Sequence, residues 1–202
     1  MSRARPVVDE SRNPWITLSS EVPYENAWIS VRHDEVLDPS GRKGIYGVVS
    51  PRNYALGVLA IHDDATTVLV GQYRYALKRY TWEMPEGGGA KDVDPRISIE
   101  RELREETGLR ASHWEELVTM HLSNSVTDEL AITWVAWDLS EVDSEPESTE
   151  ELALWRVPFA DLVSMVWSGA ITDSMTVAAV AKLEAMRLRG ELPAALGAIL
   201  RS

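Results

Sequence analysis

The chain contains no cysteine among its 202 residues, which excludes disulfide scaffolds, thiolate zinc sites and cysteine nucleophiles. It has only four histidines, and no two of them are clustered, so a histidine-based metal site is not expected. No uninterrupted apolar run reaches the roughly 18 residues of a membrane span, and no apolar segment typical of a secretory signal follows the Arg-containing N-terminus. We therefore expect a cytoplasmic protein with no membrane partner.

Basic residues are also few, with 20 Lys and Arg against 32 Asp and Glu and a net charge of −12. Such a chain lacks the broad basic surface that is typical of nucleic-acid binding, so no nucleic-acid partner is expected. The acidic excess favours solubility and also suits a protein that holds a divalent cation. Any such metal should be bound by carboxylates, which favours Mg²⁺, with Mn²⁺ as its substitute.

The distribution of apolar residues predicts an α+β domain. Apolar residues make up 45% and charged residues 26% of the chain, which is enough to bury one core. Short or alternating apolar segments predict strands at 27–37, 44–50, 54–61, 67–70, 117–121, 130–137 and 152–157, with 54–61 and 67–70 forming a central hairpin. Helices are expected at 97–106, 159–167, from a Thr172 or Asp173 cap to 189, and after Pro193. Residues 1–14 should form a loose arm.

Three carboxylates are expected to share one face of the helix at 97–106, which Gly108 is placed to cap. Glu102, Glu105 and Glu106 are spaced at i, i+3 and i+4, where like charges repel by about 0.2–0.5 kcal/mol per pair. The spacing from Arg101 to Glu105 offsets part of this repulsion. One interpretation is a solvated helix face; the other is a bound Mg²⁺ or Mn²⁺ that converts the repulsion into coordination.

A run of three glycines, Gly87-Gly88-Gly89, precedes this helix. Glycine lets the backbone approach a ligand closely and adopt positive φ, although such a run is also typical of a flexible turn. No Gly-Lys-Ser/Thr follows, so the run is not a phosphate-binding P-loop.

Together, the glycines and the helix resemble the Nudix box, which reads G, five residues, E, seven residues, then R-E-U-x-E-E-x-G-U with U aliphatic. Gly87 lies at the first Gly, and the second half matches at Arg101, Glu102, Leu103, Glu105, Glu106, Gly108 and Leu109. Val93 replaces the first Glu, which in the family pairs with the box Arg. Asp92 or Asp94 is an alternative partner for Arg101, unless the loop follows another path.

Segments outside the box resemble the ADP-ribose and nucleoside-diphosphate-sugar pyrophosphatases of this family, at 23–30, 71–75, 82–87, 123–129 and 157–174. The resemblance implies a Nudix α/β/α sandwich with a mixed central sheet. It also implies an added N-terminal antiparallel β-sheet that is exchanged across a homodimer. Residues 1–50 would then be the arm and dimerisation sheet, and residues 51–202 the hydrolase domain.

The activity that this resemblance implies is divalent-metal-dependent hydrolysis of the diphosphate bond in ADP-ribose or nucleoside-diphosphate sugars such as GDP-mannose. The products are a nucleoside monophosphate and a sugar phosphate. The implied metal ligands are Glu102 and Glu106, with Glu105 as a third, directly or through a catalytic water, and the backbone carbonyl of Glu86. Gly87, Arg101 and Gly108 are the structural residues of the box.

The general base is expected in the acidic loop at 141–151, as in related enzymes. Among Glu145, Glu147, Glu150 and Glu151 we favour Glu147 or Glu150, because Glu151 is close to the next strand. A loop of this composition is also simply well solvated.

Three residues are candidates for substrate binding. Arg74 is a candidate for the diphosphate or for a strand-surface salt bridge. Glu83 is a candidate for a sugar hydroxyl or for pairing with a neighbouring cation. Trp28 resembles an aromatic residue in the N-terminal sheet of the family, which implies stacking on the base; the alternative is a core or dimer contact.

A nucleotide-sugar-binding sensor that has lost hydrolysis is the alternative function, motivated by Val93. Such regulators usually also lose box glutamates, and none is lost from this helix.

Overall fold

The computed structural model describes residues 8–143 and 152–201. The chain forms two compact units. The first extends to Arg52 and includes 125–128, and the second comprises 53–124 and 129–202.

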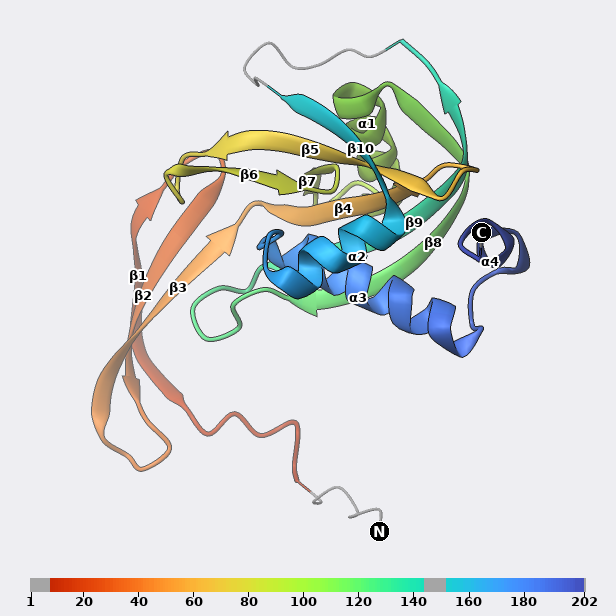
Figure 1. Cartoon of the computed structure of the whole chain (residues 1–202). Coiled ribbons are helices and arrows are strands. Elements are labelled where there is room, and N and C mark those ends of the chain that lie inside the picture. Colours follow the sequence, from red (N-terminus) through yellow and green to blue (C-terminus); the bar gives the residue numbers. More distant parts are fainter. Residues whose placement is uncertain (1–7, 144–151, 202) are drawn as a thin grey trace. The chain divides into compact units, whose positions relative to one another are not determined.

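The first unit is a three-stranded antiparallel sheet in the order β1 (Ile16–Glu25), β2 (Ile29–Leu37) and β3 (Lys43–Pro51) (Figure 1). Strands β2 and β3 pair without interruption from Ile29 opposite Pro51 to Leu37 opposite Lys43. The separate N-terminal antiparallel sheet is therefore confirmed.

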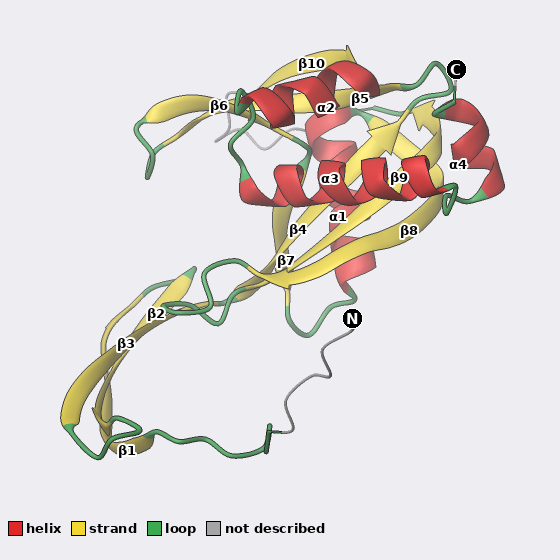
Figure 2. Cartoon of the chain, turned by 60° about the horizontal axis from the view of Figure 1, so that its bottom comes forward, coloured by secondary structure: helices red, strands yellow, loops and turns green. Residues whose placement is uncertain are grey.

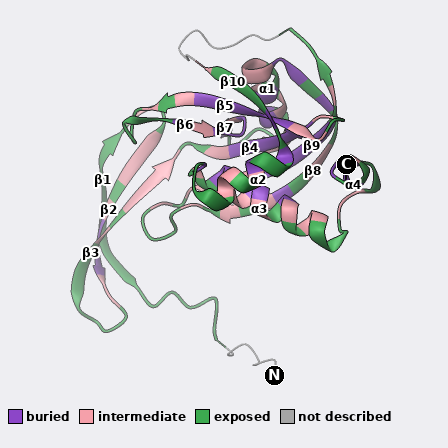
Figure 3. Ribbon diagram, viewed as in Figure 1, coloured by how far each residue is buried: buried purple, intermediate pink, exposed green. Residues whose placement is uncertain are grey.

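Strand β1 was not among the strands expected from apolar alternation. Every residue of β1 is exposed, as its green colour in Figure 3 shows. Alternation identifies a strand only when one face is buried and the other is solvated, and β1 has no such difference between its faces. Strand β2 also begins two residues later than predicted, because Asn26 accepts hydrogen bonds from the backbone of Trp28 and Ile29, both at 2.8 Å.

A short segment from much later in the chain completes this unit. The backbone N–H of Val49 donates to the carbonyl of Val126 at 2.8 Å. The Tyr46 hydroxyl donates to the carbonyl of Ser125, also at 2.8 Å. The end of β3 is thus held by the loop that follows β8.

The second unit is built on a mixed sheet in the order β10 (Ala153–Pro158), β5 (Thr66–Arg74), β4 (Asn53–Ile61), β9 (Leu130–Glu141) and β8 (Leu109–His121). Strand β4 is parallel to β9, and the other pairs are antiparallel. Two short strands are added, β6 (Arg79–Glu83) against β5 and β7 (Glu86–Ala90) against β4.

Helices cover both faces of this sheet (Figure 2): α1 (Pro95–Thr107), α2 (Phe159–Ser168), α3 (Ser174–Arg189) and α4 (Ala194–Ile199). Strand β4 is buried from Leu56 to Ile61 and supplies both faces alternately. Its residue Val58 packs in one core with Ile99 of α1, whereas Leu59 packs in the other core with residues of α2, α3 and α4. This is the predicted α/β/α sandwich.

The predicted hairpin of 54–61 and 67–70 is correct only at its turn. Strands β4 and β5 pair at Ile61 and Thr67 and then diverge, because β4 pairs with β7 and β9 while β5 pairs with β6 and β10. Local sequence places the turn, whereas the partners of the two strands come from distant segments.

The helix termini follow the expected capping chemistry. Asp94 caps α1 by accepting from the backbone N–H of Arg96, and Gly108 ends the helix with φ +67°. Asp173, one of the two predicted caps, accepts from the backbone N–H of Thr176 at 2.7 Å at the start of α3. None of the helices within 8–143 and 152–201 combines the length and hydropathy of a transmembrane span.

The turn between β4 and β5 supports a prediction about acid stability. Asp64 accepts from the hydroxyl and backbone N–H of Thr66 and from Arg156, and these bonds lower the pKa of Asp64 to about 2. A depressed carboxyl pKa stabilises the folded state above the unfolded value of 3.8, and this contribution is lost as the pH falls through 2. We expect Asp64→Asn to lower the free energy of unfolding at pH 7, by a margin that narrows between pH 4 and pH 2.

Urea unfolding of both proteins at several pH values measures this margin. Asp63→Asn is the matched control, because it removes the same charge from the same turn and leaves the bonds to Thr66 and Arg156 intact. A margin for Asp64→Asn that stays constant with pH, or that Asp63→Asn reproduces, would contradict the prediction.

Candidate active site

The site begins where α1 packs against the glycine strand β7. A Cβ added to Gly87 would lie 2.3 Å from Cδ and 2.4 Å from Cγ of Glu102, and one added to Gly89 would lie 2.5 Å from Leu56 Cδ1. The groups that come close to these glycines are side chains of α1 and β4, and the approach of a ligand to the run stays a prediction. The glycines do not use the positive φ that the residue allows, since they lie in a strand and none is among the positive-φ residues. The helix approaches β7 closely because these positions lack side chains.

Arg101 organises two of the helix carboxylates. Its Nη1 lies 2.5 Å from Oε2 of Glu105, and its Nη2 lies 2.5 Å from Oε1 of Glu102. Both glutamate side chains are only 16% exposed. Asp94, one of the alternative partners considered for Arg101, instead caps the helix. Arg101 thus offsets the repulsion between the two carboxylates and fixes their direction.

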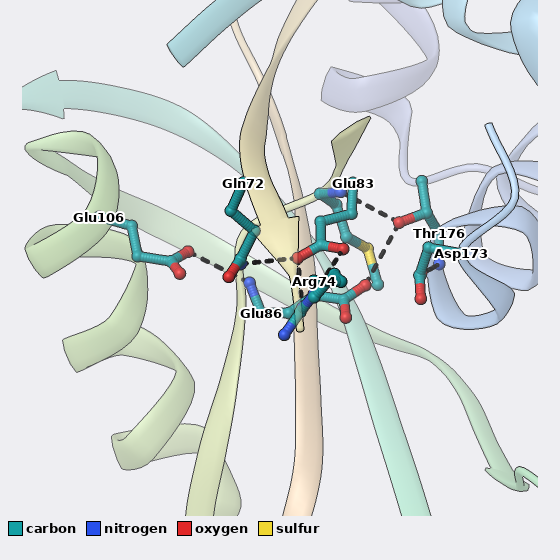
Figure 4. Close-up of polar contacts among 8 residues, drawn as sticks. Gln72, Arg74, Glu83, Glu86, Glu106, Asp173 and Thr176 are labelled. Carbon is teal, nitrogen blue, oxygen red and sulfur yellow. Dashed lines mark hydrogen bonds and ion pairs between the residues drawn. The ribbon is translucent and has the colours of Figure 1, made fainter. Parts of the chain in front are cut away.

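The third helix carboxylate is connected to the main chain before the box. The backbone N–H of Glu86 donates to Oε2 of Glu106 at 3.2 Å (Figure 4). The main chain at Glu86 therefore lies beside the carboxylate helix, as expected for a residue whose carbonyl is a candidate metal ligand.

The side chain of Glu86 belongs to a second group of carboxylates. Oxygen atoms of Glu83, Glu86 and Asp173 lie within 4.8 Å of one another. Glu83 is 2% exposed and pairs with Arg74, whose Nε lies 3.2 Å from Oε2 and whose Nη2 contacts Oε1. Gln72 adds a hydrogen bond to Glu83 at 2.9 Å. Of the alternatives for Arg74 and Glu83, the structure therefore shows the salt bridge, and the two residues pair with each other.

The environment disfavours negative charge in this group. Burial raises the pKa of Glu83 and outweighs the opposing effect of Arg74. Burial, followed by the nearby charge of Asp173, raises the pKa of Glu86 well above its ordinary value. Burial alone would lower the pKa of Arg74, but the bonds and charge of Glu83 raise it overall. The positive charge of Arg74 therefore does not compensate for the negative charge of the three carboxylates in this group.

The donors fit a hard divalent cation, because both groups consist of carboxylate oxygens. A cavity of about 450 Å³ opens beside the second group. It is lined by Arg74, Tyr75, Ala76, Leu77, Thr81, Glu83, Thr172, Asp173 and Ser174. The Arg74 side chain is 39% exposed and so remains accessible to a ligand oxygen.

Most of the predicted site residues lie together in the second unit. Strands β5, β6 and β7 and helix α1 carry Arg74, Glu83, Glu86, Gly87, Arg101, Glu102, Glu105, Glu106 and the cap Gly108. Trp28 belongs to the first unit, where it is 73% exposed between β1 and β2. The candidate bases Glu147 and Glu150 lie outside the described residues.

Sequence reasoning missed two contributors, both at the start of α3. The sequence predicts Asp173 only as a helix cap, and it assigns no role to Thr176. Thr176 bonds to Met84 and Glu86, which precede it by 92 and 90 residues. No local pattern signals such a contact, although the resemblance at 157–174 had included this end of the domain.

Comparison with known proteins agrees with this architecture. Residues 51–175 match the family described as NUDIX domain. Residues 12–49 match the family described as nucleoside diphosphate sugar hydrolase N-terminal domain. The chain therefore belongs to the Nudix family and is a Nudix hydrolase.

Within that family it groups with the ADP-ribose and nucleoside-diphosphate-sugar pyrophosphatases. It is 33% identical to the ADP-ribose pyrophosphatase of Mycobacterium tuberculosis over 84% of this chain and 83% of that protein. It is 29% identical to the GDP-mannose pyrophosphatase of Cronobacter sakazakii over 68% of this chain and 75% of that protein. A crystal structure of an ADP compounds hydrolase shares the fold, with a TM-score of 0.79 at 20% identity, over 91% of this chain and 100% of the other.

Proposed function

We propose that this protein hydrolyses the diphosphate bond of ADP-ribose or nucleoside-diphosphate sugars in a Mg²⁺-dependent reaction that releases a nucleoside monophosphate and a sugar phosphate. The observation that carries the proposal is the set of three box glutamates on α1, packed on Gly87 and joined to Glu86 through Glu106. The names of the relatives support this substrate class.

In this proposal, Glu102 and Glu106 hold the metal, together with Glu105 and the carbonyl of Glu86. A bound Mg²⁺ neutralises phosphate charge and lowers the pKa of an attacking water. Arg101 keeps Glu102 and Glu105 directed during the reaction, since it bonds to both.

Arg74 is proposed to bind diphosphate oxygens with the exposed part of its guanidinium, because a planar fork matches two phosphate oxygens. Glu83 orients Arg74 and is the proposed acceptor for a sugar hydroxyl. Glu147 or Glu150 remains the proposed base, and Trp28 the proposed stacking partner for the nucleobase.

The test is turnover of ADP-ribose, GDP-mannose and UDP-glucose with Mg²⁺, followed by identification of the products. We expect a nucleoside monophosphate and a sugar phosphate from at least one of them, loss of turnover with a chelator, and recovery with Mn²⁺. Folded protein that converts none of the three would overturn the proposal.

No observation favours the alternative of a sensor without hydrolysis. Val93 leaves Arg101 without the family's usual loop partner, yet Arg101 is held by Glu102 and Glu105. We also propose that residues 1–50 form the dimerisation segment of a cytoplasmic homodimer and that 51–202 form the hydrolase domain. The exposed apolar side chains of β1, including Ile16 and Val22, support a partner for that sheet.

A further inference from the structure

We propose that Thr176, the third residue of α3, is a positioning residue for the metal-binding carboxylates. Its hydroxyl holds the corner between β6 and β7, defined here as Met84, Pro85 and Glu86, and this corner holds Glu106. The inference rests on the proposed function, because it concerns the same metal site.

The first step is the contact between Thr176 and the corner (Figure 4). The Thr176 side chain is fully buried. Its hydroxyl accepts from the backbone N–H of Met84 at 3.0 Å and donates to Oε1 of Glu86 at 3.2 Å. One hydroxyl therefore fixes both the main chain at the beginning of the corner and the side chain at its end.

The second step is that the start of α3 is itself fixed. Asp173 accepts from the backbone N–H of Thr176 at 2.7 Å, which sets the first turn of the helix. The neighbouring residues Met175, Ala179 and Val180 are buried in the core shared with Leu59 of β4. Thr176 thus projects from a packed element and can serve as a rigid support.

The third step is that the corner has little freedom on its opposite side. A Cβ added to Gly57 of β4 would lie 2.3 Å from Cε of Met84 and 3.4 Å from Cγ of Glu86. The Pro85 carbonyl also accepts from the backbone N–H of Val58 at 3.0 Å. The corner is therefore held between β4 and Thr176.

The fourth step connects the corner to the carboxylate helix. The side chain of Glu86 meets Thr176, while the backbone N–H of the same residue donates to Glu106 at 3.2 Å. Loss of the Thr176 hydroxyl would leave the Met84 N–H without this acceptor and remove one of the hydrogen bonds that hold the Glu86 carboxyl, whose other partner is Asp173. A shift of Glu86 would then move both the donor to Glu106 and the carbonyl proposed to bind metal.

The test compares Thr176→Val, which keeps the shape but removes the hydroxyl, with Thr176→Ser, which keeps the hydroxyl. The dissociation constant for Mn²⁺ is measured by electron paramagnetic resonance of the free ion, alongside kcat and KM. Groups that orient metal ligands typically affect metal affinity or activity by 10–100-fold. We expect Thr176→Val to weaken Mn²⁺ binding and lower kcat by about tenfold each, with KM for the sugar nucleotide within about twofold of wild type. Thr176→Ser should stay within about twofold in all three.

Thr67→Val is the matched control. Thr67 is also fully buried, and its hydroxyl has no hydrogen-bond partner within the part of the chain that the structure describes. It lies seven residues before Arg74 on β5, about 23 Å away at the usual rise of a strand. The same substitution there should leave Mn²⁺ affinity and kcat unchanged.

Several results would overturn the inference. The first is a Thr176→Val protein that binds Mn²⁺ with wild-type affinity. The second is a Thr176→Ser protein that is as impaired as Thr176→Val, because this result would indicate that Thr176 acts through packing. If Thr176→Val does not fold, Glu86→Ala replaces it, since it removes the acceptor and leaves the bond from Met84 to Thr176. Unchanged Mn²⁺ affinity in Glu86→Ala would then be the contradicting result. Wild-type protein without turnover overturns the proposed function and this inference together, whereas an active wild type with an unaffected variant overturns the inference alone.

Discussion

Replacing Glu106 by Gln is expected to lower kcat about a thousandfold while the fold remains intact. Glu106 is the helix carboxylate that meets the main chain of Glu86, and it is a proposed direct metal ligand. A catalytic metal contributes several kcal/mol to transition-state stabilisation, and loss of about 4 kcal/mol corresponds to a thousandfold in rate. The amide oxygen of Gln still accepts from the Glu86 N–H, so the substitution removes charge rather than the contact.

Steady-state kinetics over a range of Mg²⁺ concentrations measures this effect. Glu100→Gln is the matched control on the same helix, because Glu100 bonds to Arg96 at 3.2 Å and its side chain is 39% exposed. It should retain activity within about twofold. If kcat of Glu106→Gln stays within tenfold of wild type at low Mg²⁺, Glu106 is not a metal ligand.

Gly87→Ala is expected to lower kcat/KM about a hundredfold with only a modest loss of stability. The new Cβ would lie 2.3 Å from Cδ of Glu102, so the Glu102 side chain must leave its position and its bond to Arg101. Because Gly87 is extended, Ala is compatible with its backbone, and the cost of about 1 kcal/mol comes from repacking. A misplacement of about 1 Å in a catalytic group is enough for a hundredfold loss.

Mn²⁺ binding and thermal unfolding separate the two effects of this substitution. We expect weakened Mn²⁺ binding together with a cooperative unfolding transition close to that of wild type. Gly88→Ala is the control on the same strand, since the three atoms nearest to its Cβ all belong to the exposed Asn53 side chain, with Nδ2 at 2.9 Å. If both variants lose kcat/KM and Mn²⁺ affinity equally, the added methyl group disturbs strand β7 itself and not the position of Glu102.

The strongest sequence predictions were those whose physical cause is local. Spacing of three and four residues places Glu102, Glu105 and Glu106 on one face of a helix in any fold. The cap residues Asp173 and Gly108 act on backbone groups within four residues, and both caps were found. Short apolar runs located β4 and β9, because each strand has neighbours that bury it.

The weaker predictions depended on distant neighbours. Strand β1 gave no pattern since all of it is exposed. The glycine run permits positive φ or a flexible turn by its sequence, whereas it pairs with β4 as part of β7. The carboxyl groups of Glu83 and Asp173 are 90 residues apart in the sequence, and only packing brings their oxygens within 4.8 Å.

The sequence alone determined the family, the carboxylate helix and the mixed α+β architecture, because box spacing, helical periodicity and strand alternation are properties of neighbouring residues. The tertiary structure decided which residues surround those carboxylates. It placed Gly87 against Glu102, paired Arg74 with Glu83, and brought Thr176 to the corner before the box. These contacts join segments separated by up to 92 residues. Such segments come close only because both cores pack, and no local pattern in the sequence records that proximity.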